Sequence, residues 1–369
     1  MKRPARPGQL LLLAAALSVT LLHAQQASSG PWVMESSGTT AGLRGIHAVG
    51  GGVAWASGTN GTVVRTEDGG YAWQRCATPS SAEKLDFRGI WAWDANTAMV
   101  MSSGPGEQSR IYKTTDGCAH WKLLFTNPDT DGFWDAMVFR NRTKGNLLGD
   151  PVQGRFIFLN THDGGKTWKR SSAEGLKAGA GATGAFAASN SSLLAGLRAP
   201  VLFGTVGGYI YAQSYQGTVD FLARPGTPIK MKEQWRRTLT PLHAPGNSMG
   251  IFSVGYHEGS VPGYSYTLIA VGGDYTKPAE STGTAAWSSD SQHWTAAAKP
   301  PHGFRSAVAW DAAAKAWITA GTNGSDISYD DGKTWAPLDN GNWNALSLPW
   351  AVGPHGRIAK LDTRKLPKK

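Results

Sequence analysis

The sequence lacks the short motifs that identify most enzymes. Its 369 residues contain no nucleophile elbow, phosphate-binding loop, zinc signature or EF-hand loop. It has only two cysteines, Cys76 and Cys118, and two isolated thiols make a poor metal site. We therefore expect no metal and no cofactor, and a redox activity has no cofactor-binding motif to support it.

Long apolar runs are also scarce. The one clear example, Leu10 to Leu22, follows three basic residues and precedes a polar segment, which is typical of a secretory signal peptide at residues 1–24. The run is too short to span a bilayer comfortably, so we expect a periplasmic or secreted protein without an integral membrane segment. An oxidising compartment would allow the two cysteines to form a disulfide.

Acidic residues are in the minority. The formal net charge is +10, and removal of residues 1–24 takes three of the 36 Lys and Arg and none of the 26 Asp and Glu, which leaves +7. Several basic residues fall in residues 362–369, which we interpret as a solvated basic tail. A mildly basic exported chain with this distribution does not indicate nucleic-acid binding.

Helical periodicity is almost absent, and the chain is rich in Gly (47) and Trp (16). Its many short apolar runs indicate short strands and an all-β protein. A repeated pattern, Thr/Ser-x-Asp-x-Gly-x-x-Trp, defines what we call the Asp-box turns. It is complete at residues 66–73, 161–168 and 328–335, has Cys118 in place of Gly at 114–121, and is one residue short at 288–294.

The residue types of the Asp-box turns suit a folding device. The Asp and Ser/Thr side chains can accept local backbone N–H bonds, Gly supplies a positive φ, and Trp packs against the following strand. We therefore assign a structural role to the paired residues Asp68 and Trp73, Asp116 and Trp121, Asp163 and Trp168, Asp290 and Trp294, and Asp330 and Trp335.

The spacing of the turns predicts a β-propeller of four-stranded blades. Asp163 and Asp290 are 127 positions apart, whereas the other neighbouring Asp residues are 40 to 48 apart. We place one degenerate blade in the long gap, at residues 183–238. Its third strand is expected at Tyr209–Ala212 and its surviving aromatic is Trp235, with an insertion from Gln216 to Glu233 in place of the turn.

The two ends of the chain complete the predicted ring. Residues 344–361 supply three short strands without an Asp-box turn, and Pro31–Glu35 can pair with them as the outer strand, which covers an exposed edge. The prediction is a single seven-bladed propeller at residues 31–361, expected to be a monomer. Six or eight blades also fit if the insertion is interpreted differently.

Nearly all of residues 31–361 resemble the BNR/Asp-box propellers, and among them the photosystem II stability and assembly factor-like proteins. The segments similar to a non-photosynthetic bacterial branch of that group are Phe133–Met137, Leu148–Pro151, Gly184–Asn190, Gly272–Pro278 and Arg305–Trp310. The resemblance implies a binding protein that engages a partner through an arginine-rich surface. Sialidases share such turns, but their Arg-Ile-Pro signature is missing, since residues 43–46 read Leu-Arg-Gly-Ile.

The candidate site lies where the innermost strands converge on the central channel. Alignment of these strands places Arg44, Arg88 and Arg305 at one entrance, which we call the channel mouth. Converging guanidinium groups suit a carboxylate, sulfate or phosphate. We therefore expect an anionic protein or glycan partner at this mouth.

The same face should also receive other polar side chains, namely Trp134, Asp135, Asp150, Asp274, Tyr275 and Lys277. These groups could bind a ligand, or they could pair with the arginines as an inter-blade salt-bridge network. An enzymatic alternative, a sialidase-like glycoside hydrolase or a lyase, would use two carboxylates as acid and base or nucleophile. The candidates for that role are Asp135, Asp150, Asp274 and Glu258.

Overall fold

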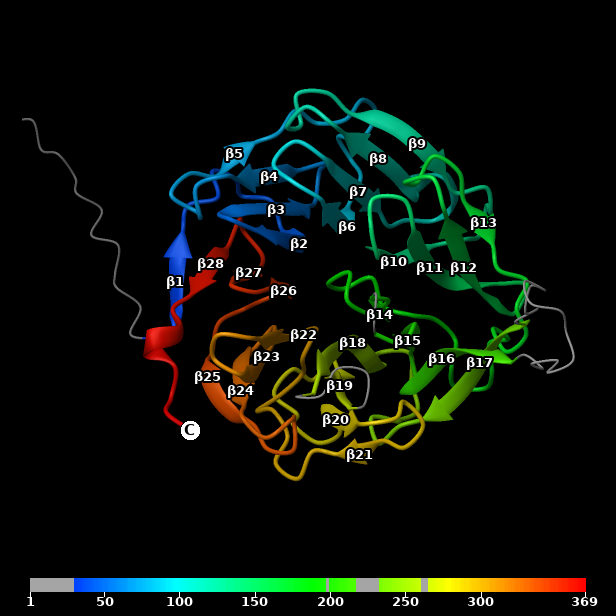
Figure 1. Cartoon of the computed structure of the whole chain (residues 1–369), viewed down its shortest axis with the longest axis vertical. Helices are drawn as coiled ribbons and strands as arrows, with labels where there is room; N and C mark the ends of the chain where they lie inside the picture. The colour runs from blue at the N-terminus through cyan, green and yellow to red at the C-terminus, as the bar shows by residue number, and fades with distance from the viewer. Residues whose placement is uncertain (1–29, 197–198, 217–231, 260–264) are drawn as a thin grey trace, which may run out of the picture.

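The computed structural model describes residues 30–196, 199–216, 232–259 and 265–369. The predicted signal peptide and most of the predicted insertion at 216–233 lie outside these residues. The described chain forms seven antiparallel sheets of four strands each, arranged as the blades of a ring (Figure 1). The prediction of an all-β, seven-bladed propeller is therefore confirmed, and the alternatives of six or eight blades are excluded.

Within each blade the strands run in order from the innermost to the outermost. Blade one comprises β2 (Leu43–Gly50), β3 (Val53–Gly58), β4 (Val63–Thr66) and β5 (Gln74–Arg75), and blade two comprises β6 (Phe87–Ala92), β7 (Ala98–Ser102), β8 (Arg110–Thr114) and β9 (Lys122–Thr126). Blade three comprises β10 (Trp134–Phe139), β11 (Gly145–Val152), β12 (Arg155–Thr161) and β13 (Lys169–Arg170), and blade four comprises β14 (Leu193–Leu194), β15 (Leu202–Gly204), β16 (Tyr209–Gln216) and β17 (Lys232–Leu239). Blade five comprises β18 (Met249–Glu258), β19 (Tyr266–Asp274), β20 (Ala285–Ser288) and β21 (Thr295–Ala296). Blade six comprises β22 (Ala307–Asp311), β23 (Ala316–Gly321), β24 (Gly324–Ser328) and β25 (Ala336–Asp339). Blade seven comprises β26 (Ala345–Ser347), β27 (Trp350–Val352), β28 (Ile358–Leu361) and β1 (Trp32–Glu35).

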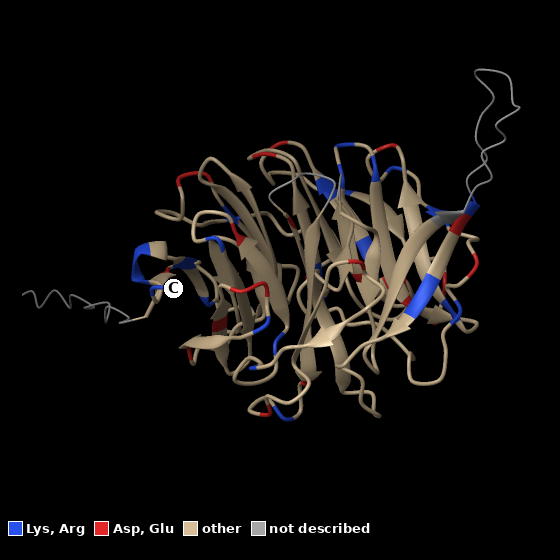
Figure 2. Ribbon diagram, turned by 60° about the horizontal axis from the view of Figure 1, so that its bottom comes forward, with Lys and Arg blue, Asp and Glu red and all other residues tan. Residues whose placement is uncertain are grey.

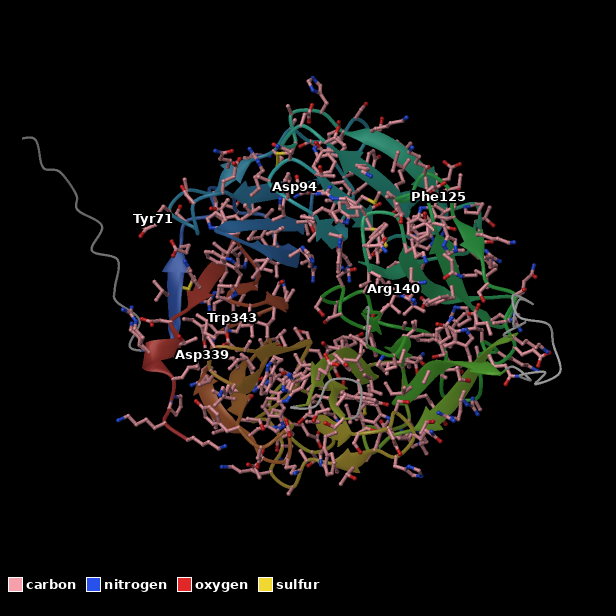
Figure 3. The ribbon with its side chains drawn as sticks, in the orientation of Figure 1. Tyr71, Asp94, Phe125, Arg140, Asp339 and Trp343 are labelled. Carbon is pink, nitrogen blue, oxygen red and sulfur yellow. A yellow bond between two sulfur atoms is a disulfide. The ribbon has the colours of Figure 1, made fainter. Side chains whose placement is uncertain are left out.

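Blade seven closes the ring by joining the two ends of the chain, as predicted. Strand β1 pairs antiparallel with β28, with Trp32 opposite Leu361. The Trp32 ring packs against Trp343, with 5.4 Å between centroids, and its Nε1 donates to Ser325 Oγ of blade six at 2.9 Å. Trp343 Nε1 in turn donates to the Asp339 carboxylate at 3.1 Å (Figure 3). Strand β1 thus contacts three segments of the C-terminal part of the chain, around residues 325, 343 and 358–361.

Blade four differs from the others in its outer half. Its third strand begins at Tyr209, as predicted, and pairs along its whole length with β17. Trp235 on β17 is buried and packs edge-on against Phe158 of blade three, with 4.7 Å between ring centroids. The aromatic ring therefore seals the contact between blades three and four although no Asp-box turn precedes it.

The second Gly of the Asp-box turn is required by the neighbouring blade. Gly70 has a φ of +101°, and a Cβ placed there would lie 2.2 Å from the Trp350 ring on β27 of blade seven. Gly165 and Gly332 likewise have positive φ and abut Met99 and Ile269 on the second strands of the preceding blades. A side chain at this position would separate adjacent blades, which explains the residue type.

Cys118 occupies this Gly position in blade two, with a φ of +68°. It forms a disulfide with Cys76 of blade one, across a Cα–Cα distance of 5.3 Å and a sequence separation of 42. The bond restricts the unfolded chain as well as joining the two blades. The cysteine thus connects blades one and two covalently at a position where other blades only pack.

The C-terminal residues are partly docked on the ring. Residues 363–365 form a short 3-10 turn (η2, Thr363–Lys365), and Leu366 packs against the core between blades six and seven. Lys, Arg, Asp and Glu occur in many of the loops at the two ends of the blades and on several strands (Figure 2). No helix within the described residues is long and apolar enough to cross a membrane.

The carboxylate of Asp163 organises its turn through several hydrogen bonds. Thr161 Oγ1 donates to Oδ1 at 2.9 Å, and Thr167 donates through its backbone N at 3.0 Å and its Oγ1 at 2.6 Å. These donors, the side-chain hydroxyl of Thr167 first among them, lower the pKa of Asp163 to about 2. The turn is therefore held by an ionised carboxylate across the physiological pH range.

Replacing Asp163 by Ala should lower the free energy of unfolding by about 1 kcal/mol, the net contribution of solvent-exposed hydrogen bonds of this kind. The folded-state pKa is depressed, so the contribution is present above the ordinary Asp pKa and is lost as pH falls toward 2. Urea unfolding at pH 7 and pH 3 measures both effects. Asp131→Ala, at an exposed loop position, is the matched control, and an equal loss in both variants would contradict the assignment.

Candidate functional site

The innermost strands begin at the channel mouth with β-bulges. The pairing register skips Arg44 in β2, Arg88 in β6, Asp135 in β10 and Phe252 in β18, and it also skips Asp150 in the second strand of blade three. A bulge re-aims the side chain of its extra residue out of the ladder. All five of these side chains line one cavity of about 430 Å³ at the mouth.

The floor of this cavity is a segment of residues 184–192, which we call the channel segment. It precedes β14 and lies inside the ring (Figure 1). The Asn190 side chain pairs with the backbone of Met137 in blade three, accepting from its N at 2.8 Å and donating to its O at 3.0 Å. Ser189 Oγ donates to Ser306 O of blade six at 2.7 Å. The mouth is therefore a pocket with a floor.

Two arginines form the cationic side of the pocket, at blades one and two. Arg88 Nε lies 2.9 Å from Asp86 Oδ2, while Arg44 Nε lies 4.0 Å from Asp86 Oδ1, too far for a hydrogen bond. Burial, together with the positive charge of Arg88, lowers the pKa of Arg44. Their side chains remain 34% and 28% exposed, so both guanidinium groups are accessible from the mouth while sharing a single carboxylate.

Two carboxyl groups form the acidic side, on blade three. Asp135 is 1% exposed, and neither of its carboxylate oxygens has a hydrogen-bond partner in the described chain. Burial raises the pKa of Asp135 well above its usual value, and the nearby charge of Asp150 raises it further. Asp150 Oδ1 accepts from Ala185 N of the channel segment at 2.8 Å, yet burial still raises its pKa.

Aromatic rings form the third side, from the channel segment and blades five and six. Phe186 stacks on Phe252 with 3.6 Å between centroids, and Phe304 meets Phe252 edge-on at 4.7 Å. Tyr275 follows β19 and is half exposed at the outer rim. The pocket therefore combines cationic, acidic and apolar walls around one small volume.

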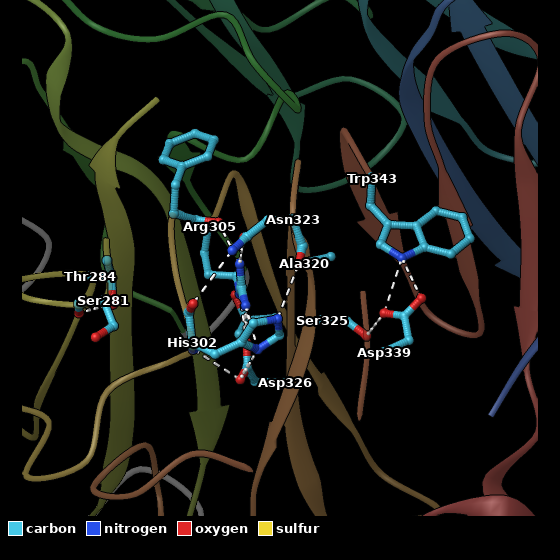
Figure 4. Close-up of polar contacts among 12 residues, drawn as sticks. Ser281, Thr284, His302, Arg305, Ala320, Asn323, Ser325, Asp326, Asp339 and Trp343 are labelled. Carbon is cyan, nitrogen blue, oxygen red and sulfur yellow. Dashed lines mark hydrogen bonds and ion pairs between the residues drawn. The ribbon is translucent and has the colours of Figure 1, made fainter. Parts of the chain in front are cut away.

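Arg305 does not belong to this pocket, and its assignment to the mouth was wrong (Figure 4). Its guanidinium is fully buried, forms a salt bridge with Asp326 and donates from Nη1 to Asn323 Oδ1 at 2.6 Å. Its backbone N donates to the second strand of the preceding blade, to Gly272 O, as Leu43 N donates to Gly353 O.

Arg305 is therefore the structural counterpart of Leu43, and the counterpart of Arg44 is Ser306, which lines the pocket. The sequence alignment was displaced by one residue. In a β-strand such a displacement reverses the side to which every side chain points. A single-residue error thus moved a buried structural arginine into the predicted binding site.

Four further candidates lie apart from the pocket. Trp134 is buried and stacks on Phe125 of blade two, and its neighbour Phe133 lines the mouth instead. Asp274 caps its own turn by accepting from Thr276 N at 3.0 Å and Oγ1 at 2.7 Å, which lowers its pKa.

Lys277 is exposed beyond this turn and does not line the pocket. Glu258 ends β18, six residues beyond Phe252, the residue of that strand that lines the pocket. At about 3.3 Å per residue this places the Glu258 backbone roughly 20 Å from Phe252. Of the four proposed carboxylates, the structure therefore brings together only Asp135 and Asp150.

The sequence analysis did not identify the aromatic wall or the channel segment as parts of the site. Phe186 and Phe304 lie in the segments before β14 and β22, and Phe252 lies within β18. For single apolar residues a core role is the default interpretation. Within the described residues, no group of three or more His, Cys, Asp or Glu side chains could hold a metal ion. The walls of the pocket offer a ligand charged groups, hydrogen-bonding groups and apolar rings.

A larger groove, of about 970 Å³, lies at the outer rim between blades seven and one. It is lined mainly by Ser, Thr, Gly and loop backbone from residues 36–41, with Arg75 and His355 at its edges. Among its described lining residues no charged side chain is buried, whereas the mouth pocket holds Asp135. We therefore regard the mouth pocket as the candidate functional site.

The fold and the central pocket define this chain as a seven-bladed β-propeller. Its sequence matches no known family model and no curated protein. Among solved structures it is similar to "YCF48 bound to D1 peptide", with 16% identity, a TM-score of 0.57, and coverage of 90% of this chain and 94% of that one. It is also similar to "YCF48 from Cyanidioschyzon merolae", with 15% identity, a TM-score of 0.56, and coverage of 90% and 99%. At these identities the likeness concerns the fold.

Proposed function

We propose that this chain is an exported binding protein that accepts an anionic group of a partner at the channel mouth. The observation that carries the proposal is the pairing of Arg44 and Arg88 around one carboxylate, Asp86. Two guanidinium groups with one acid leave a positive site at the mouth, and their planar forks suit a carboxylate. A similar fold is described as bound to a peptide, which supports a protein segment as partner.

The partner's carboxylate would enter from the open side of the pocket. Arg88 Nη1 already donates to Ala187 O of the channel segment at 3.1 Å, which holds its side chain in place before a ligand arrives. A fixed cation loses less conformational entropy on binding than a free one. Arg44 Nε is buried without a hydrogen-bond partner in the described chain, while the side chain as a whole is 34% exposed, so a ligand can reach the exposed part of its guanidinium group.

The test is binding of acidic peptides to the double variant Arg44→Ala/Arg88→Ala. Hydrogen bonds to charged groups contribute about 1.5–3 kcal/mol each, so we expect affinity to fall at least tenfold. Calorimetric titration with peptides that end in a free carboxylate or in an amide measures this directly. Arg142→Ala is the matched control, since Arg142 pairs with Asp94 outside the pocket. Unchanged binding in a folded double variant would overturn the proposal.

The second candidate function is glycoside cleavage, favoured by the presence of Asp135 and Asp150 in one pocket. One neutral and one ionised carboxyl group could serve as acid and base. The adjacent arginines and the aromatic wall instead favour binding without turnover. Release of reducing sugar from acidic glycans, abolished by Asp150→Asn, would support the enzymatic alternative over the binding role.

A further inference from the structure

Asp135 is the feature of the pocket that anion binding does not explain. It is almost fully buried, its two oxygens have no hydrogen-bond partner in the described chain, and it lines the cavity. A buried carboxyl group without partners is unfavourable by an amount comparable to several lost hydrogen bonds. Such a group is retained more readily where a ligand supplies the missing donors.

Two of the three guanidinium nitrogens of Arg88, the cation nearest Asp135, already donate to other acceptors. Arg88 directs Nε to Asp86 and Nη1 to Ala187 O. Asp150 is an acceptor and is already bonded to Ala185 N. The acidic side of the pocket therefore presents two carboxyl groups that a hydrogen-bond donor or cation of a ligand can satisfy. This side lies on blade three, next to Arg88 of blade two.

We infer that the mouth pocket recognises a small zwitterionic group, with its carboxylate at Arg44 and Arg88 and its ammonium at Asp135 and Asp150. An ammonium group carries three donors, which suits the unpartnered oxygens of Asp135. The apolar part of the ligand lies against Phe186, Phe252 and Phe304. The chemistry is that of one amino-acid unit, free or at the C-terminal end of a peptide whose last residue is lysine.

The dimensions of the site agree with this ligand class. The cavity of about 430 Å³ lies within the usual range for small-molecule pockets, and the channel segment contributes residues 185–188 to its lining. Because the cationic and acidic walls are adjacent, they suit a ligand whose carboxylate and ammonium are separated by only a few bonds. The aromatic wall favours an aromatic or aliphatic side chain in the free amino acid.

This inference rests on the proposed function for the carboxylate half and adds the ammonium half. Three ligands separate the contribution of the carboxylate from that of the ammonium. Phenylalanine carries both groups, N-acetylphenylalanine keeps only the carboxylate, and phenylalanine amide keeps only the ammonium. Calorimetric titration should show phenylalanine binding at least tenfold more tightly than either derivative. A peptide ending in lysine, compared with the same peptide ending in norleucine, tests the peptide source.

The decisive variant is Asp135→Asn/Asp150→Asn, which preserves shape and removes both charges. We expect phenylalanine to lose at least tenfold in affinity while N-acetylphenylalanine binds as before. Arg44→Ala/Arg88→Ala should weaken both ligands. Loss in the arginine variant with no loss in the aspartate variant would overturn the zwitterion inference and leave the anion-binding function intact. Absence of binding by the free amino acid and the lysine peptide would also overturn the inference.

The pH dependence of binding gives an independent readout. The charged groups facing Asp135 are Asp150 on β11 and Arg88 on β6, and no histidine of the described chain lines the pocket. Because burial raises the pKa of both carboxyl groups, protons compete with the ammonium as the pH is lowered. Phenylalanine affinity should therefore fall with decreasing pH in the wild type and stay flat in the aspartate variant. Equal slopes in both proteins would contradict the inference.

The melting temperature shows whether the aspartate variant is folded as stably as the wild type. A raised folded-state pKa means that stability falls as pH rises from the ordinary Asp range through the raised value. Removing the buried charge of Asp135 should therefore raise the melting temperature at pH 7, or at least leave it unchanged. A weakened ligand affinity in a variant of equal or higher stability then reports on recognition alone.

Discussion

Replacing Arg305 by Ala should lower the free energy of unfolding by about 3–5 kcal/mol, the usual effect of breaking a buried ion pair. The substitution leaves the Asp326 carboxylate fully buried, with only His302 as a remaining side-chain partner in the described chain. It also removes the donor to Asn323, which sits in the hairpin between β23 and β24. Denaturant unfolding monitored by tryptophan fluorescence measures the loss.

A double variant separates the charge effect from packing. Arg305→Met/Asp326→Leu removes both charges and keeps most of the side-chain volume, so it should recover at least half of the lost stability. Ligand binding at the mouth should be unchanged in any variant that folds, because Arg305 points away from the pocket. Loss of ligand binding in a variant of unchanged stability would show that Arg305 takes part in the binding site at the channel mouth.

Replacing Trp32 by Ala should cost about 3–5 kcal/mol, the range for truncation of large buried aromatic side chains. Trp32 anchors β1 by its contact with Trp343 and its hydrogen bond to Ser325. Its loss leaves a void where the outer strand of blade seven meets blade six, and frees the edge of β28. Thermal and urea unfolding measure the change.

Val33→Ala on the same strand is the matched control. Val33 is 39% exposed and points to the opposite side of β1, so its truncation should change stability by less than about 1 kcal/mol. Similar losses in both variants would mean that the strand as a whole, rather than the Trp32 anchor, sets the stability of the closure. Unchanged stability in Trp32→Ala would contradict the role of ring closure.

The sequence predicted the architecture because each blade repeats its own local chemistry. Pairs such as Asp163 with Trp168 recur at blade spacing, and a unit of known size can be counted even where one copy is degenerate, as around Trp235. Closure by residues 31–35 followed from the missing outer strand of the last unit. These features depend on local turn chemistry and on repetition, both of which are visible in a single sequence.

The site was predicted less well because it is made by departures from the repeat. Asp135 and Asp150 point into the pocket only because each is the extra residue of a bulge, and bulges shift the alternation on which alignment depends. Arg305 was misassigned for the same reason, since β22 of blade six pairs with β23 in an unbroken register. The floor comes from the channel segment, whose partners lie between 35 and 117 residues away in sequence.

That floor has a consequence for the order of folding. Asn190 reaches Ile90 across 100 positions, and Ser189 reaches Ser306 across 117, so these contacts have a high sequence separation and are slow to form. Individual blades can assemble from neighbouring strands, but the pocket needs blades one, two, three, five and six in place around the channel segment. A chain whose ring has not closed would therefore keep ordered blades but lack the complete walls and floor of the pocket.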